Sequence, residues 1–213
     1  MFDFAQYMPP LLRGAGLTIF LVVVSGVIGT VIGLVFGTAR SAPLRVVRWA
    51  AAVYPGFIRG IPILIILLFM YFALPLMFPS ATLSRSVTAI VGLSVYAGAY
   101  LTEIFRGSIQ AIPRGQLEAA EALGMHYVQK MRYVILPQAM KIAVPPGIGF
   151  LIALVKATSL VSVISYTDLT RAGKIISSQN QAPLSTFLVV AALYFVISYP
   201  LSLLGRWYER RLA

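Results

Sequence analysis

Long stretches without a single charged side chain dominate this sequence. No Asp, Glu, Lys or Arg occurs in 14–39, 60–84 or 175–205, and most residues there are apolar. The hydrocarbon core of a bilayer is about 30 Å thick, and an α-helix needs roughly 20 residues to cross it. Each stretch is long enough, so the chain is predicted to cross a membrane at least three times.

Two shorter stretches complete the predicted set of spans. Residues 86–102 carry no charge, and within 142–165 only Lys156 does. Charged residues make up 11% of the chain, whereas they are about a quarter of an ordinary soluble domain. We therefore expect an all-α membrane protein with about five transmembrane helices in one domain, 14–206. The expected spans are about 15–38, 62–78, 86–105, 142–165 and 186–204. The first lacks the features of a cleaved signal peptide and is expected to stay in the mature protein.

The net charge of +11 follows from where the basic residues lie along the chain. They concentrate in alternate connections between the predicted spans, and basic residues mark cytoplasmic loops. The N-terminus is therefore predicted outside and the C-terminus inside, with no need for a nucleic-acid partner, and the basic loops suit anionic membrane lipid. The basic residues on the predicted inner side are Arg40, Arg45, Arg48, Arg106, Arg114, Lys130, Arg132, Lys141, Arg206, Arg210 and Arg211.

Small residues in the first predicted span indicate close helix packing. Gly29, Gly33 and Gly37 recur every fourth residue, and Ser25 extends the row. Such a row lets two helix backbones approach closely inside a bilayer. Ahead of the second span, Pro55, Gly60 and Pro62 predict that no continuous regular helix runs from residue 48 to 63.

A short amphipathic helix is predicted at about 115–124. Leu117, Ala120 and Leu123 recur at helical spacing, and polar residues occupy the other side. Gly124 suits a left-handed C-terminal cap. A helix this short needs a surface to dock on. Two interpretations remain open from the residues alone, a helix resting on lipid head groups or one that binds a partner.

The stretch 118–138, EAAEALGMHYVQKMRYVILPQ, resembles the signature of inner-membrane permease subunits of binding-protein-dependent ATP-binding-cassette (ABC) importers. Val134 replaces the usual isoleucine. The segments FIRGIP, AYLTEIFRGSIQAIPRGQ and LVKATSLVSVI resemble further parts of the polar amino acid uptake branch. Ile61 stands where threonine is common and Ala157 where aspartate is often found. The identity of the cargo is therefore left open, because the acid that could bind an ammonium group is missing at 157. The positions that match the signature are Glu118, Ala119, Ala120, Gly124, Leu136 and Pro137.

This resemblance implies a type I importer permease fold whose short helix is a coupling helix seated in an ATPase subunit. Glu118 would make polar contacts to that ATPase, Ala119 and Ala120 would permit close seating, and Gly124 would set the turn. Leu136 and Pro137 would redirect the chain toward the fourth span. The implied partners are two ATP-binding subunits that use ATP and Mg²⁺, a second permease copy or paralogue, and a solute-binding protein. The implied location is a bacterial cytoplasmic membrane, and the implied cargo is a polar amino acid.

Polar residues inside the predicted spans are candidates for the solute path, because lipid penalises them. Lys156 can attract a carboxylate, snorkel outward, or neutralise Glu103 or Asp168. The hydroxyls of the fourth span, with Thr158, Ser162 and Ser165 on one predicted face, can orient an ammonium group or bond their own helix backbone. Glu103 is expected to pair with Arg106 or Arg59. The full set of path candidates is Lys156, Thr158, Ser159, Ser162, Glu103 and Tyr96.

Several chemistries find no support in the residues. Cysteine is absent and His126 is the only histidine, so no metal site is expected. No phosphate-binding loop is present, since Gly173 and Lys174 lack the flanking residues that such a loop requires. The chain is thus expected to bind no cofactor and to be a transport subunit, not an enzyme. The alternatives left open are the same architecture carrying an opine, a modified amino acid or another small polar solute, and a passive channel.

Overall fold

A computed structural model describes residues 4–212, and helices are the only regular secondary structure in that range. In the bilayer core no water is present to satisfy a free backbone N–H or C=O, so a chain this apolar forms helices. The α-helices are α1 (Phe4–Ala39), α2 (Arg45–Arg59), α3 (Ile63–Leu68), α4 (Leu74–Met77), α5 (Arg85–Gln110), α6 (Arg114–Ala122), α7 (Tyr127–Gln129), α8 (Leu136–Ala157), α9 (Leu169–Asn180) and α10 (Pro183–Leu212).

Irregular helical turns join some of these elements. Two are π-helical, Phe69–Ala73 between α3 and α4 and Lys130–Ile135 between α7 and α8. Two are 3₁₀-helical, Pro79–Ala81 before α5 and Thr158–Ile164 after α8. The 3₁₀ turn after α8 ends at Ser165, whose φ is 61°. The fourth predicted span is therefore not one α-helix. The prediction that Thr158, Ser162 and Ser165 share one face was wrong, because a 3₁₀-helix has three residues per turn instead of the 3.6 of an α-helix.

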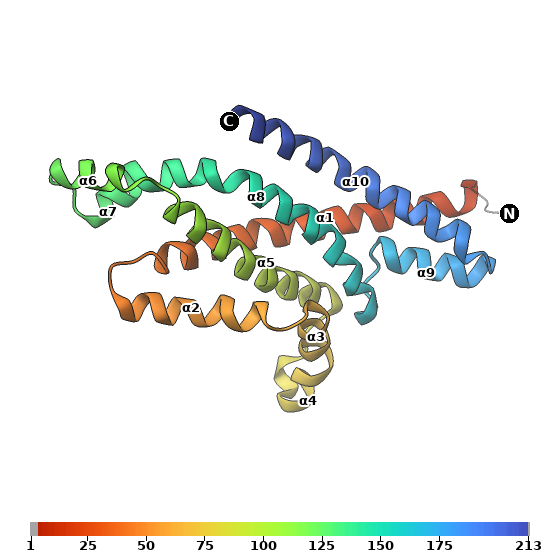
Figure 1. Ribbon diagram of the computed structural model, residues 1–213. Helices are drawn as coiled ribbons and strands as arrows, with labels where there is room; N and C mark the ends of the chain where they lie inside the picture. The colour runs from red at the N-terminus through yellow and green to blue at the C-terminus, as the bar shows by residue number, and fades with distance from the viewer. Residues whose placement is uncertain (1–3, 213) are drawn as a thin grey trace.

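Figure 1 shows α1, α5, α8 and α10 running lengthwise through the molecule, with α6 and α7 at one end and α9 near the N-terminus at the other. Within residues 4–212, four helices are long and apolar enough to cross a membrane: Gln6–Ala39, Arg85–Gln110, Tyr127–Ile164 and Pro183–Arg211. Arg45–Arg59 and Ile63–Met77 together pass the same test, bent by 94° between them. The architecture therefore has four or five candidate spans.

The second span differs from its prediction in one respect. Pro55 lies inside α2 without ending it, and the break comes later, over residues 60–62. Pro55 and Ala51 are buried, and the hydroxyl of Tyr54 donates to the carbonyl of Val95 on α5 at 2.6 Å. Packing against α5 offsets the hydrogen bond that proline removes from the helix.

The most extensive helix contact in residues 4–212 joins α1 to α5. A Cβ atom added at Gly29 would lie 2.6 Å from the Cβ of Ala97, and one at Gly33 would lie 2.6 Å from the Cβ of Leu101. At Gly37 the corresponding atom is the Cβ of Phe105, at 2.8 Å. The contact advances by four residues on each helix, so the two helices run parallel and in register over about two turns. Only a hydrogen in place of a side chain permits this backbone approach.

We expect Gly33→Leu to destabilise the bundle. The new side chain has no room against Leu101, and overpacking of this kind costs about 1–3 kcal/mol. The thermal unfolding midpoint of the protein in detergent should fall by several °C, roughly 2–4 °C per kcal/mol for a chain of this size. Gly16→Leu in the same helix is the control, because nothing lies within 4 Å of the Cβ position at Gly16. Equal midpoints for the two variants would contradict the packing assignment.

Candidate functional site

Helix α6 lies at one end of the bundle (Figure 1). A glycine, Gly124, caps its C-terminal end. Gly124 has a φ of +73°, a backbone conformation that L-residues rarely adopt. Its N–H donates to the carbonyl of Glu121 at 2.9 Å, and the N–H of Met125 donates to that of Ala120 at 3.1 Å. This pair of bonds is a Schellman motif, which satisfies the last carbonyls of the helix and reverses the chain. The left-handed cap predicted at Gly124 is therefore present.

One side of α6 is anchored and the other is free. Ala120 is buried, and Leu117 packs against a small apolar cluster formed by Ile109, Ile112, Met131, Ile135 and Ala139. Glu118 and Ala119 are exposed. Leu123, which shares the apolar spacing of Leu117 and Ala120, lies outside this cluster and is 77% exposed.

The chain reverses at Gly124 and not at Leu136 and Pro137. Residues Tyr127–Ile164 form one long helical segment, and Leu136 and Pro137 lie inside it where the π-helical turn passes into α8. A proline has no N–H to donate, and a π-helical turn before it accommodates the missing bond. The predicted redirection at this step was wrong.

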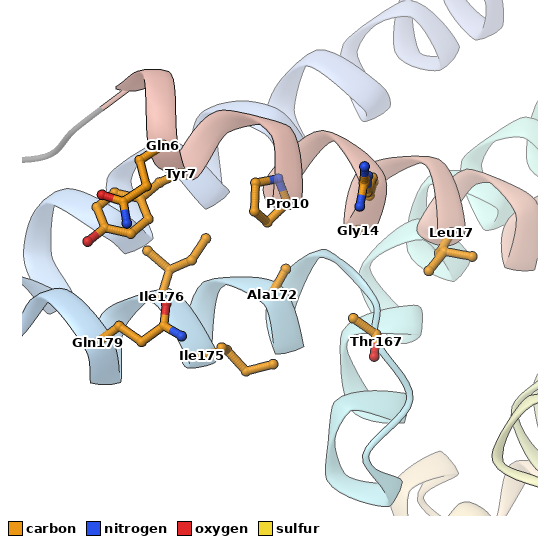
Figure 2. Close-up of a pocket in the computed structure, with 11 residues that line it drawn as sticks. Gln6, Tyr7, Pro10, Gly14, Leu17, Thr167, Ala172, Ile175, Ile176 and Gln179 are labelled. Carbon is orange, nitrogen blue, oxygen red and sulfur yellow. The ribbon is translucent and has the colours of Figure 1, made fainter.

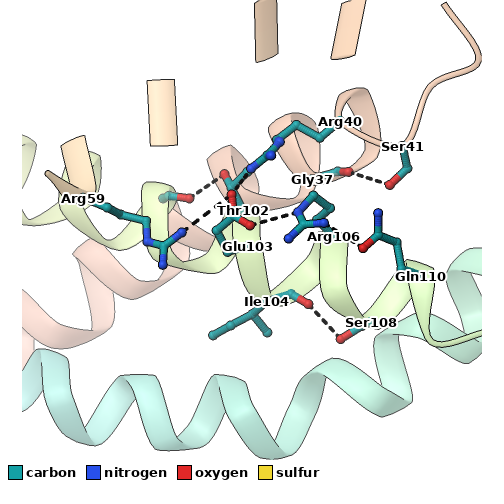
Figure 3. Close-up of polar contacts among 11 residues, drawn as sticks. Gly37, Arg40, Ser41, Arg59, Thr102, Glu103, Ile104, Arg106, Ser108 and Gln110 are labelled. Carbon is teal, nitrogen blue, oxygen red and sulfur yellow. Dashed lines mark hydrogen bonds and ion pairs between the residues drawn. The ribbon is translucent and has the colours of Figure 1, made fainter. Parts of the chain in front are cut away.

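Glu103 on α5 joins three separate elements through arginines (Figure 3). Arg106, one turn further along α5, donates from Nε to Oε2 of Glu103 at 2.9 Å. Arg40, just after α1, contacts Oε1, and Nη1 of Arg59 at the end of α2 lies 3.7 Å from the same oxygen. The expected pairing with Arg106 and Arg59 is therefore present. The Arg40 contact was missed, because only the parallel packing of α1 on α5 brings Arg40 beside Glu103.

The charge in this cluster is unbalanced. One carboxylate, whose side chain is 19% exposed, faces three guanidinium groups. Burial, and then the positive charges of Arg106 and Arg59, lower the pKa of Arg40 from its usual value. An arginine remains protonated under any physiological condition. The cluster therefore carries a positive surplus at the end of the bundle where α6 lies.

Aromatic rings continue from this cluster along α5. The guanidinium of Arg59 lies 5.3 Å from the ring centroid of Tyr100, within range of a cation–π contact. The rings of Tyr96 and Tyr100 are 4.7 Å apart, and Tyr100 stacks on Phe150 of α8 at 5.5 Å. Tyr96 is thus part of an aromatic contact between α5 and α8.

The polar candidates near the end of α8 separate into two groups. The hydroxyls of Thr158 and Ser159 donate to the backbone carbonyls of Val155 and Lys156, each at 2.7 Å. Ser162 accepts a hydrogen bond from Nζ of Lys174 at 3.0 Å, a partner that its position in the sequence did not suggest. These hydroxyls are engaged within the chain, as the backbone-bonding alternative predicted for the first two.

Lys156 differs from its neighbours because it is exposed and forms no ion pair among residues 4–212. It neutralises neither Glu103 nor Asp168. It lines a groove of about 520 Å³ between α8 and α10, whose polar lining also includes Tyr194, Ser198, Tyr199 and Ser202. The ammonium group is therefore available to an anionic group that enters this groove.

Asp168 is a buried acid whose role the sequence did not reveal. It caps α9, where its carboxylate accepts from the N–H groups of Thr170 at 3.0 Å and Arg171 at 2.9 Å. The hydroxyl of Tyr194 on α10 also donates to it at 3.2 Å. Burial raises the pKa of Asp168, and these hydrogen bonds oppose the rise. The acid therefore fastens α9 to α10, a structural role.

A groove of about 360 Å³ runs between the first part of α1 and α9 (Figure 2). Its lining is mixed, with apolar Pro10, Leu17 and Ile176 beside polar Gln6 and Gln179. Nowhere within residues 4–212 do three or more His, Asp or Glu side chains gather as a metal would require. The polar features of the chain are thus a free helix face, an arginine-rich cluster and a lysine-lined groove.

These features define a class, a multi-pass helical membrane protein with a projecting helix available for docking. Comparison with known families agrees, since residues 29–213 match the model of the "Binding-protein-dependent transport system inner membrane component". The chain belongs to this family, the permease subunits of ABC importers.

Individual relatives align over nearly the whole chain. A probable amino-acid ABC transporter permease, YckA of Bacillus subtilis, is 38% identical over 90% of this chain and 84% of its own length. The glutamine transport system permease GlnP of Escherichia coli is 38% identical over 96% of this chain and 94% of its own. These relatives place the chain beside permeases of the polar amino acid branch.

Solved structures confirm the architecture. A crystal structure of an amino acid ABC transporter with histidines has a TM-score of 0.89 and 34% identity, and the alignment covers 99% of both chains. An inward-facing structure of the MetNI methionine ABC transporter has a TM-score of 0.79 and 25% identity over 97% of both chains. The predicted type I importer permease fold is therefore confirmed.

We expect Glu103→Gln to lower stability by about 1–3 kcal/mol, because hydrogen bonds to charged groups are lost and three arginines then face each other without a counter-charge. Thermal unfolding in detergent measures this. Glu209→Gln, an exposed acid near the C-terminus, is the matched control. The double variant Arg40→Gln with Glu103→Gln should lose less than the sum of the single variants. Strict additivity would refute the pairing of Arg40 with Glu103.

Proposed function

We propose that this chain is the permease subunit of an ATP-driven importer that carries a polar amino acid. Family membership supports the importer, and relatives whose names specify glutamine or amino acids support the cargo. On this proposal an extracytoplasmic binding protein delivers the solute, and separate ATPase subunits supply the energy. The permease acts together with a second copy or a paralogue, because about five spans are too few to enclose a solute path by themselves.

The free face of α6 is the observation that carries the coupling part of the proposal. Ala120 and Leu117 hold the helix to the bundle, while Glu118, Ala119 and Leu123 face away from it. Glu118, Ala119 and Leu123, which is 77% exposed, are thus left uncovered by the rest of the chain. The ATPase would receive this face, with Gly124 fixing the angle at which α6 stands.

The orientation follows from the same assignment. If α6 meets a cytoplasmic ATPase, the basic connections at that end lie in the cytoplasm, and the N-terminus and α9 lie outside. This arrangement agrees with the positive-inside distribution of arginine and lysine. The proposed location is the cytoplasmic membrane of a bacterium, and ATP and Mg²⁺ are used by the partner subunits.

Within the span, Lys156 is the proposed contact for the solute. Its ammonium group lies in a groove between α8 and α10 with the hydroxyl-bearing Ser198, Tyr199 and Ser202. An amino acid has a carboxylate for the lysine and an ammonium group for hydroxyl oxygens. Thr158, Ser159 and Ser162 would support this groove through the backbone and Lys174.

Gly124→Asp should abolish coupling. The assay uses proteoliposomes that contain this chain, the ATPase and any second permease. Binding protein loaded with one amino acid at a time is added, and ATP hydrolysis is recorded. Wild type should be stimulated by one ligand, and the variant should insert normally but show no stimulation. Aspartate at this cap would put a negative charge at the negative end of the α6 dipole, beside the face that docks. Gly124→Asn is the matched control, since asparagine tolerates this conformation and should retain most of the activity. Full stimulation of Gly124→Asp would rule out the coupling role.

Lys156→Met should weaken solute recognition while leaving assembly intact. Loss of a charge-assisted contact worth about 1.5–3 kcal/mol raises the half-saturating concentration for uptake by roughly tenfold or more. Lys141→Met, an exposed lysine near the start of the same helix, is the control and should behave as wild type. Unchanged affinity and rate in Lys156→Met would remove Lys156 from the solute path.

A further inference from the structure

A basic cleft lies at the α6 end of the bundle, separate from both the groove at Lys156 and the free face of α6. It has a volume of about 430 Å³ and is lined by the connection after α1, the start of α2, the end of α5, and α6. Arg40, Arg48 and Arg114 line it together with Tyr127, whose hydroxyl donates to the carbonyl of Ser41 at 3.4 Å. Volumes of this size are usual for small-ligand sites, about 300–1,000 Å³.

The cleft holds more positive charge than the chain itself neutralises. Arg40 shares the single carboxylate of Glu103 with two further arginines. Arg48 uses Nη1 to donate to the backbone carbonyls of Ala42 and Pro43, each at 2.8 Å, and these are neutral acceptors. Neither Arg48 nor Arg114 has an ion pair in the described part of the chain. Such a cleft attracts an anion, and guanidinium groups match the geometry of a phosphate.

A stripe of exposed apolar residues begins beside the cleft. Val46, Trp49, Val53 and Phe57 recur every three or four residues on α2, and each is between 66% and 80% exposed. The opposite side of α2 packs on α5 through Pro55 and its neighbours. Trp49 follows Arg48 directly in sequence, so the positive cleft and the apolar stripe adjoin. An inorganic anion would use only the positive cleft and not the apolar stripe.

We propose that the cleft binds the phosphate head group of an anionic phospholipid, with its acyl chains lying along the stripe Val46–Trp49–Val53–Phe57. Charge complementarity selects the head group, and the apolar stripe selects a lipid over a free phosphate. A phosphate between Arg48 on α2 and Arg114 on α6 offsets the repulsion between these arginines and braces α6 against the first connection. Assignment to the inner leaflet rests on the proposed function, whereas lipid binding itself does not.

The two tryptophans of the chain, Trp49 and Trp207, allow a direct test. In the Trp207→Phe variant, Trp49 is the only tryptophan. The full chain is reconstituted in phosphatidylcholine vesicles containing a quarter phosphatidylglycerol, and either one or the other lipid carries bromines on its acyl chain to quench fluorescence. We expect brominated phosphatidylglycerol to quench Trp49 at least twofold more, per mole, than brominated phosphatidylcholine.

Variants then test whether the arginines cause this preference. Arg48→Gln with Arg114→Gln should abolish it, since each arginine near a membrane surface contributes roughly a fivefold preference for anionic lipid. Arg114→Gln alone should reduce it, and this substitution breaks no ion pair within residues 4–212. Arg210→Gln with Arg211→Gln removes the same charge outside the cleft and should keep the preference.

Three results would overturn the proposal. Equal quenching by both lipids in the parent protein would mean that the stripe faces lipid without head-group selection. No quenching by either lipid would mean that protein, such as a second copy, covers the stripe. Loss of the preference on adding millimolar inorganic phosphate at constant ionic strength would identify a free-anion site. The assay contains no ATPase, so a failure of the coupling proposal leaves its outcome unaffected.

Discussion

The parallel contact between α1 and α5 is the interaction on which the rest of the structure depends. Hydrophobic burial does not drive helices together in lipid, so close packing and a few polar contacts must hold them. Gly29, Gly33 and Gly37 let α1 approach the α5 backbone closely enough that added Cβ atoms would overlap. This contact sets α5 in the centre, where α2 and α8 also pack on it. It also fixes where Arg40, at the end of α1, meets Glu103.

Ion pairs hold together the end of the bundle where α1 leaves α5, beyond the row Gly29, Gly33 and Gly37. Glu103 gathers arginines from the end of α1, the end of α2 and its own helix (Figure 3). Since one carboxylate cannot neutralise three guanidiniums, the region keeps a net positive charge beside α6. Arg40 belongs both to this cluster and to the basic cleft, where Arg48 and Arg114 add further positive charge. This one side chain links the packing of α1 on α5 to the proposed lipid site.

Local features of the site were predictable where a single residue decides them. Gly124 has no side chain to oppose a positive φ, and Arg106 lies one turn from Glu103, so the cap and this ion pair follow from spacing. Arg40, in contrast, is far from Glu103 in sequence and becomes its partner only when α1 packs on α5. The exposure of Leu123 and the partner of Ser162 were likewise not predictable from the local sequence. Helical spacing cannot say where a turn leads the chain away, or that Lys174 reaches Ser162 from α9.

The sequence by itself determined that this chain is a helical membrane protein of the importer permease family. Two features of the sequence are enough for this conclusion. The uncharged stretches are long enough to cross a bilayer, and the family signature lies around α6. Tertiary structure alone decided that Pro55 stays inside α2, that a 3₁₀ turn follows α8, that Arg40 contacts Glu103 and that a basic cleft forms. These depend on which helices meet and how closely. That choice is made by packing between residues distant in the chain, where contact energies outweigh the preference of any single segment.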